Sequence, residues 1–154
     1  MNIECWFDGG CRPHNPGGAG AWGAIIKLPA YKDERESIFE WYGVIPQAPW
    51  VTNNIAEYNG VIAILNKLIE LQYQGRVPPE ATITIYGDSM LVVKQLSGEW
   101  RRNQTNKKLF EYSGLAIQGL KYFGVGRIQF KHIPREQNSR ADKLVNEAFN
   151  VNGL

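Results

Sequence analysis

The sequence predicts an α/β fold with a mixed five-stranded sheet and helices on both faces. The first 45 residues hold three strand-like segments joined by short links, which is the pattern of an antiparallel meander. Beyond residue 54, helical segments alternate with two further short strands, and strands that alternate with helices run parallel. The predicted strand order is therefore 3-2-1-4-5, with strands 1–3 antiparallel and strands 4 and 5 parallel to strand 1.

Each predicted element has its own signal. Residues 2–8 are mostly apolar or aromatic, as in a central strand covered on both faces. Residues 11–20 contain two prolines and three glycines and are expected to form a loop. Helical spacing of apolar residues predicts a long helix from residue 54 to about 72. The remaining predicted elements are strands at 21–28, 34–45, 81–87 and 126–132, a short helix ending near Gly98, a helix at about 108–123, a loop at 134–138 and a last helix at 139–149.

Composition places the chain among ordinary globular proteins. Its 154 residues are 44% hydrophobic and 21% charged, enough for one domain with a real core. We see no membrane-length apolar run, no leader and only two cysteines, so we expect a single cytoplasmic domain over residues 1–154, with reduced thiols and no membrane partner. We also expect a monomer without an organic cofactor. The net charge of +2 by itself favours an ordinary mixed surface.

Four carboxylates stand at the starts or ends of predicted elements, and each has a structural explanation when taken alone. Asp8 precedes Gly-Gly and could form a turn. Glu57 follows Asn54 by three residues, as a capping-box glutamate does. Asp88 stands where an N-cap is expected, and Asp142 lies in the first turn of the last helix.

The predicted topology favours a shared site instead. Parallel strands bring Asp8 and Asp88 to one sheet edge, and the helices that carry Glu57 and Asp142 begin at that edge. Carboxylates so close cannot all stay ionised without cations, and oxygen-only ligands suit Mg²⁺ or Mn²⁺. Two such ions support in-line phosphoryl transfer, one activating water and the other stabilising the leaving oxygen. We find no cysteine and histidine cluster for zinc in the sequence.

Four blocks of the chain, in order and over nearly its whole length, resemble type 1 ribonuclease H. The resemblance implies an RNase H-like fold that binds an RNA/DNA hybrid and cleaves its RNA strand with two divalent ions, Mg²⁺ or Mn²⁺, leaving 5′-phosphate and 3′-hydroxyl ends. It also implies that Asp8, Glu57, Asp88 and Asp142 hold the metal. The blocks are Asp8-Gly9-Gly10 with Asn15-Pro16-Gly17, then residues 52–57, 86–89 and 132–142.

The resemblance also suggests auxiliary and substrate-binding residues. His132, ten residues before Asp142, is a candidate to help product and proton leave, and Arg135 is its rival. Telling RNA from DNA requires contact with 2′-hydroxyls. The residues expected to contact the hybrid are Gly9, Gly10, Cys11, Asn15, Asn53, Asn54 and Ser89 near the cut, Thr52 and Asn106 at a DNA-strand phosphate, Trp100 on the DNA sugars, and Arg135.

Two departures from the family pattern bear on substrate binding. Residues 99–108 are too short for the basic protrusion of many bacterial relatives, and no hybrid-binding domain is expected before residue 2. Weaker hybrid binding, or reliance on a partner, follows as a hypothesis. Two alternatives stay open: the same fold acting on double-stranded RNA or branched DNA, and a hybrid-binding module without catalysis.

Overall fold

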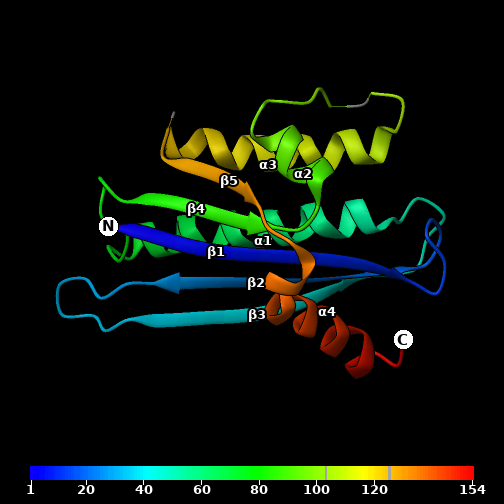
Figure 1. Cartoon of the computed structure of the whole chain (residues 1–154), viewed down its shortest axis with the longest axis horizontal. Helices are drawn as coiled ribbons and strands as arrows, with labels where there is room; N and C mark the ends of the chain where they lie inside the picture. The colour runs from blue at the N-terminus through cyan, green and yellow to red at the C-terminus, as the bar shows by residue number, and fades with distance from the viewer. Residues whose placement is uncertain (103, 125) are drawn as a thin grey trace.

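The computed structural model describes residues 1–102, 104–124 and 126–154 and contains a five-stranded mixed sheet in the order β3-β2-β1-β4-β5 (Figure 1). β1 pairs antiparallel with β2 and β2 with β3, whereas β4 runs parallel to β1 and β5 parallel to β4. This confirms the predicted fold class and strand order. The strands are β1 Asn2–Arg12, β2 Ala19–Leu28, β3 Ser37–Ile45, β4 Thr82–Gly87 and β5 Ile128–His132.

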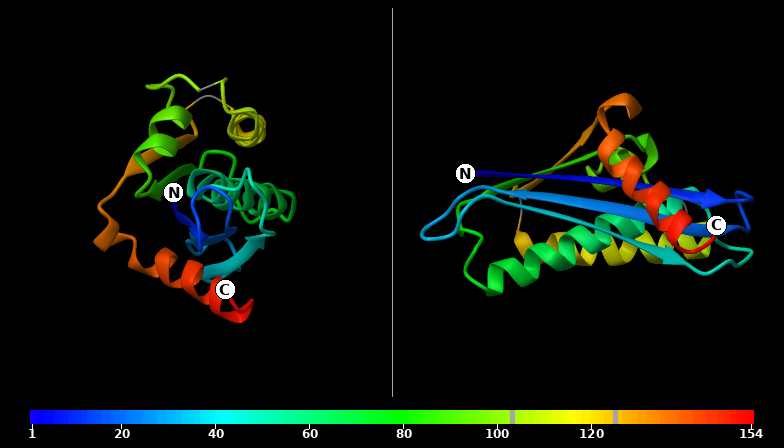
Figure 2. Two further views of the ribbon diagram at one scale, coloured as in Figure 1. Left: turned by 90° about the vertical axis from the view of Figure 1, so that its right-hand side faces the viewer. Right: turned by 90° about the horizontal axis from the view of Figure 1, so that it is seen from below.

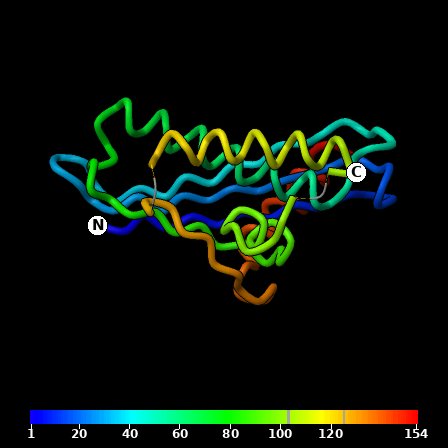
Figure 3. Tube along the Cα trace, turned by 90° about the horizontal axis from the view of Figure 1, so that it is seen from above, coloured from blue at the N-terminus to red at the C-terminus, as the bar shows by residue number. Residues whose placement is uncertain are grey.

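Two helices cover opposite faces of the sheet (Figure 2). Because side chains alternate along a strand, Ile3, Cys5 and Phe7 of β1 join the main core under α1. On the other face, Ala21 and Ile25 of β2 pack against α4. α3 runs alongside α1 (Figure 3), and α2 packs beside β5. The helices are α1 Asn53–Tyr73, α2 Met90–Leu96, α3 Lys107–Phe123 and α4 Ser139–Val151, with a 3₁₀ turn η1 at Arg135–Gln137.

The first strand is longer than the sequence predicts. β1 continues to Arg12, opposite Ala19 of β2, so residues 11 and 12 belong to a strand and not to the expected loop. Pairing with β4 already ends at the Trp6–Tyr86 pair. The prediction that Asp8 ends its strand is therefore wrong: Asp8 lies inside β1, just beyond the point where β4 separates from it.

β3 also differs from the expectation, because it begins at Ser37 and not at residue 34. Tyr31 and Glu34 form an isolated antiparallel bridge before it, so the chain turns there and pairs with β2 only later. In the part of the chain that the structure describes, the stretch between α2 and α3 holds no further helix, and no helix has the length and hydropathy of a membrane span.

Gly9 sets the distance between α1 and β1. A Cβ atom on Gly9 would lie 2.4 Å from the backbone nitrogen of Glu57 and 2.5 Å from the carbonyl carbon of Ala56. The α1 backbone thus fills the space beside this glycine. Without a side chain at residue 9, the helix can approach closely enough to bring Glu57 beside Asp8.

Candidate active site

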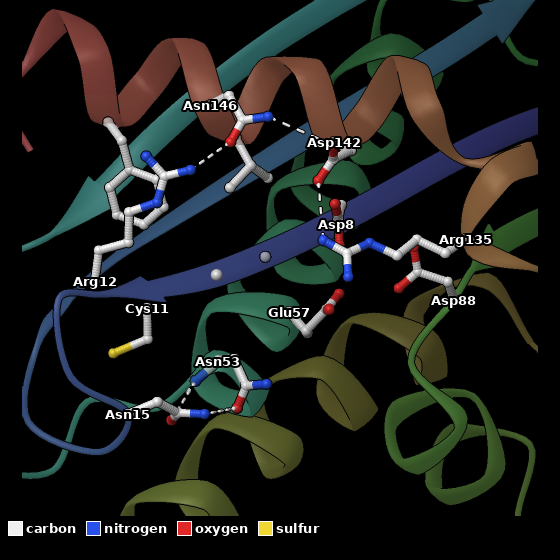
Figure 4. Close-up of a pocket in the computed structure, with 14 residues that line it drawn as sticks. Asp8, Cys11, Arg12, Asn15, Asn53, Glu57, Asp88, Arg135, Asp142 and Asn146 are labelled. Carbon is white, nitrogen blue, oxygen red and sulfur yellow. Dashed lines mark hydrogen bonds and ion pairs between the residues drawn. The ribbon is translucent and has the colours of Figure 1, made fainter.

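Three carboxylates from distant parts of the chain meet where β1 and β4 diverge (Figure 4). Asp8 comes from β1, Glu57 from α1 and Asp88 from the residue after β4. One carboxylate oxygen from each lies within 4.8 Å of the others. Asp8 and Glu57 are each only 6% exposed, while Asp88 is half-buried. The convergence follows from the parallel pairing of β1 with β4 and from the close approach of α1 at Gly9.

Asp142 is the fourth carboxylate and lies on the wall of the same pocket, which has a volume of about 320 Å³. It stands outside the tight trio. Its Oδ1 lies 4.0 Å from Nη2 of Arg135, and its Oδ2 accepts a 3.4 Å hydrogen bond from Asn146. The structure thus brings all four predicted carboxylates to one pocket, three of them with oxygen atoms within 4.8 Å of one another and the fourth, Asp142, on the pocket wall.

Burial and the neighbouring charges of the trio raise the pKa of Asp8 and of Glu57, so the site could hold a cation. Burial, followed by the charge of Asp88, raises the pKa of Asp8 to about 7. Burial, followed by the charges of Asp8 and Asp88, holds the pKa of Glu57 well above its usual range. Within the described residues, the buried Oε2 of Glu57 has no hydrogen-bond partner. Clustered carboxylate oxygens, one of them unpaired, fit a hard divalent ion such as Mg²⁺ or Mn²⁺.

The structural explanations for two of these carboxylates, Glu57 and Asp88, fail because other side chains cap their helices. The backbone N–H of Ile55 donates to Thr52 at the start of α1, and the N–H of Val92 donates to Ser89 at the start of α2. α4 begins after Asn138 without a side-chain cap. Glu57 and Asp88 are therefore not needed as caps, and both line the pocket, as does Asp142 in the first turn of α4. The predicted substrate contacts Thr52 and Ser89 are N-caps, as is Asn106 for α3.

His132 and Arg135 differ in their relation to the pocket. Arg135 lines it, whereas His132 is exposed and not among the lining residues. Nε2 of His132 lies 3.2 Å from the backbone oxygen of Asp88. In this conformation the arginine, and not the histidine, reaches the carboxylates.

Some of the predicted substrate contacts line the carboxylate pocket, and others lie elsewhere. Asn15 and Asn53 bond to each other twice, through a 2.9 Å side-chain contact and a 3.2 Å contact to the Asn53 backbone. Trp100 is 47% exposed. The contacts that line the pocket are Gly9, Gly10, Cys11, Asn15, Asn53 and Arg135, whereas Thr52, Asn54, Ser89, Trp100 and Asn106 do not.

Asn138 is a residue whose role the sequence does not reveal. It is 1% exposed, and its Nδ2 donates to the backbone oxygen of Phe7 at 2.9 Å and to Oδ2 of Asp88 at 3.2 Å. The side chain thus ties the start of α4 to β1 and orients one of the trio. In the sequence, the only indication of this role is the position of Asn138 within the 132–142 block.

We expect Asn138→Ala to lower the free energy of unfolding by roughly 2 kcal/mol, because a buried carbonyl loses its donor. The hybrid cleavage that the resemblance to ribonuclease H implies should fall by about tenfold or more, since Asp88 is no longer held in place. Urea unfolding and initial cleavage rates measure the two effects. Asn150→Ala, an exposed change on the same helix, serves as the control and should alter neither. An Asn138→Ala variant that matched this control would show that the contact with Asp88 is unimportant.

Comparisons with known proteins agree with this fold. A family model described as reverse transcriptase-like matches residues 7–148. The chain is 35% identical over 153 residues to the bifunctional protein Rv2228c of Mycobacterium tuberculosis, covering 98% of this chain but only 36% of that protein. The chain therefore spans about a third of the length of this relative. It is 30% identical to ribonuclease H of Clostridium botulinum, covering 97% of this chain and 98% of that protein.

A solved structure of a ribonuclease H has a similar fold. LC11-RNase H1, determined in complex with an RNA/DNA hybrid, superposes with a TM-score of 0.74 and is 31% identical, with 99% of each chain covered. The sheet order, the acidic pocket and the full-length match to ribonuclease H of Clostridium botulinum lead to one conclusion. The chain belongs to the ribonuclease H family.

Proposed function

We propose that this protein, with residues 1–154 acting as one catalytic domain, hydrolyses the RNA strand of RNA/DNA hybrids and leaves 5′-phosphate and 3′-hydroxyl ends. The observation that carries the proposal is the meeting of three carboxylates within 4.8 Å, with a fourth on the wall of the same pocket. Support comes from the similarity to ribonuclease H of Clostridium botulinum and to LC11-RNase H1, whose structure holds a hybrid.

Asp8, Glu57, Asp88 and Asp142 would hold two Mg²⁺ or Mn²⁺ ions. When bound, such ions supply an activated water and stabilise the leaving oxygen of an in-line displacement. The protein fixes the ligands in advance: Asp8 sits on a central strand, Glu57 is held by the close packing of α1, and Asn138 orients Asp88. Rigid placement of this kind is what a site for phosphoryl transfer needs.

Recognition of RNA would fall to the pocket wall formed by Asn15, Asn53 and the backbone of residues 9–11. These groups offer amide and peptide hydrogen-bonding atoms beside the carboxylates, where a 2′-hydroxyl of the cleaved strand can be contacted. Thr52 and Asn106, at the N-termini of α1 and α3, would hold a DNA-strand phosphate, since helix N-termini favour anions. Arg135 is better placed than His132 for the auxiliary role.

A cleavage assay tests the proposal. A short hybrid labelled on its RNA strand should be cut in Mg²⁺ or Mn²⁺ and left intact in EDTA, and the products should carry 5′-phosphates. Competition with an RNA duplex and a branched DNA junction distinguishes the alternative substrates. Failure to cut the hybrid in either metal would contradict the proposal, and binding without cutting would favour a non-catalytic module.

The raised pKa of Asp8 predicts that metal-free protein loses stability as the pH rises. A pKa of about 7 in the folded state lies above the usual 3.8, so the folded protein binds more protons between these pH values. Stability should then fall from about pH 4 to about pH 7, by on the order of 4 kcal/mol. Urea unfolding in EDTA at pH 5 and pH 8 measures the fall.

Two comparisons test this origin of the pH dependence. Mg²⁺ binds the ionised carboxylates, so its addition at pH 8 should restore stability. Asp8→Asn removes the titrating group and should reduce the pH dependence. A metal-free protein that is as stable at pH 8 as at pH 5 would show that burial and the neighbouring charges do not raise the pKa of Asp8 in the folded state.

A further inference from the structure

The carboxylate pocket continues along β1 and α4 as a groove that ends at an arginine. Successive side chains of a strand alternate in direction, so every second residue from Asp8 faces the same side. On α4, residues spaced by four and three positions share the facing side. The groove is thus bounded by Asp8, Gly10 and Arg12 on the strand and by Asp142, Asn146 and Phe149 on the helix.

Arg12 is held in place from two sides at the far end of this groove (Figure 4). Its guanidinium carbon lies 4.5 Å from the centre of the Phe149 ring, and its Nη2 donates a 2.6 Å hydrogen bond to Oδ1 of Asn146. Phe149 is 1% exposed and therefore a fixed support. Across the described part of the chain, no carboxylate forms a salt bridge with Arg12, although the side chain is exposed. Four of its five N–H donors remain after the bond to Asn146.

We propose that Arg12 binds a phosphate of the RNA strand, a few nucleotides from the bond that is cut. The inference rests on the proposed function, because the strand to be cleaved must lie over the carboxylates. From there it can follow the groove: four residues of β1, at about 3.3 Å each, separate Arg12 from Asp8 by about 13 Å. A planar guanidinium with free donors matches a phosphate, and its packing against Phe149 reduces the entropy lost on binding.

The arginine also offsets a difficulty that the carboxylates create. An acidic pocket repels a polyanionic strand, and a cation at the end of the groove attracts it to the side where cleavage occurs. A competing role exists, because Asn146 donates at 3.4 Å to Asp142 and could transmit an effect of Arg12 to that carboxylate. A positioning role would lower kcat and change the Mg²⁺ requirement, whereas a phosphate contact changes binding and its salt dependence.

The first experiment compares Arg12→Ala and Arg12→Lys with a matched control, Arg35→Ala. Arg35 is also exposed but lies in the β2–β3 connection, so its loss removes the same charge elsewhere. Arg12→Ala should raise KM for the hybrid about tenfold and reduce the slope of log KM against log salt by about 1, with kcat and Mg²⁺ half-saturation unchanged. The KM and salt slope of Arg12→Lys should lie between those of Arg12→Ala and wild type. Those of Arg35→Ala should match wild type.

The second experiment locates the phosphate. Hybrids carrying one neutral methylphosphonate at successive positions are scanned with wild type and with Arg12→Ala. At one RNA-strand position near the cut, the methylphosphonate should slow cleavage by wild type and leave cleavage by Arg12→Ala unchanged. The proposal is overturned if that position lies in the DNA strand, if no position shows the difference, or if Arg12→Ala lowers kcat and leaves KM and salt slope unchanged.

These outcomes are distinguishable from failure of the proposed function. If wild type does not cut the hybrid, the function itself is wrong. If wild type cuts it and Arg12→Ala behaves like Arg35→Ala, only the assignment of Arg12 is wrong. Melting temperatures of the variants identify any loss of activity that comes from unfolding when the contact with Phe149 is removed.

Discussion

Asp8→Asn and Asp88→Asn are each expected to lower the rate of hybrid cleavage at least about 1000-fold, because a cation site contributes several kcal/mol to lowering the barrier. An asparagine keeps the shape of the side chain but offers a neutral ligand. The fold should be retained, and Asp8→Asn should be more stable than wild type in EDTA at pH 8, since a buried charge is removed. Single-turnover cleavage in Mg²⁺ and urea unfolding measure the two effects.

Asp33→Asn is the matched control for these variants. Asp33 is exposed in the connection between β2 and β3, and the change removes the same charge without touching the pocket. This control should cleave at the wild-type rate. If Asp8→Asn or Asp88→Asn kept full turnover, the trio would not be the catalytic centre. If the control lost activity as well, net charge and not the pocket would explain the result.

Gly9→Ala is expected to destabilise the fold and to displace a site residue, although it adds only a methyl group. The added Cβ would lie 2.4 Å from the nitrogen of Glu57, and backbone atoms cannot rotate away as a side chain can. α1 must therefore shift away from β1. We expect a loss of at least about 2 kcal/mol in the free energy of unfolding, typical of overpacking. We also expect about 100-fold lower cleavage, because Glu57 is displaced from Asp8.

The neighbouring glycine provides the control for stability. A Cβ on Gly10 would lie 3.4 Å from the side chains of Phe149 and Val145, which is ordinary contact. Gly10→Ala should therefore leave the urea midpoint close to that of wild type. If Gly9→Ala were as stable and as active as the wild type, the close approach of α1 would not be what positions Glu57.

The sequence was sufficient to predict the sheet order and the meeting of the carboxylates. Neither prediction needs the details of side-chain packing. Hydrophobic periodicity separates strands from helices, and parallel pairing brings residues 8 and 88 to one edge of the sheet. The resemblance of four ordered blocks to ribonuclease H added the family, which the comparisons confirm.

Details that depend on packing between elements could not be predicted. The extension of β1 to Arg12 is decided by β2, which keeps pairing after β4 has separated. Gly9 looks like a turn residue in the sequence, although a helix backbone occupies the space beside it. Asn138 resembles an ordinary loop or cap residue, and only the folded structure shows its contacts with Phe7 and Asp88.

Titration of the metal-free protein with Mn²⁺, followed by electron paramagnetic resonance, tests most directly whether these side chains bind a divalent ion together. Wild type should take up Mn²⁺ saturably and release it when Mg²⁺ is added, whereas Asp88→Asn should bind far more weakly at the same pH and salt. Equal Mn²⁺ uptake by wild type and Asp88→Asn would contradict the assignment of the pocket as a metal centre.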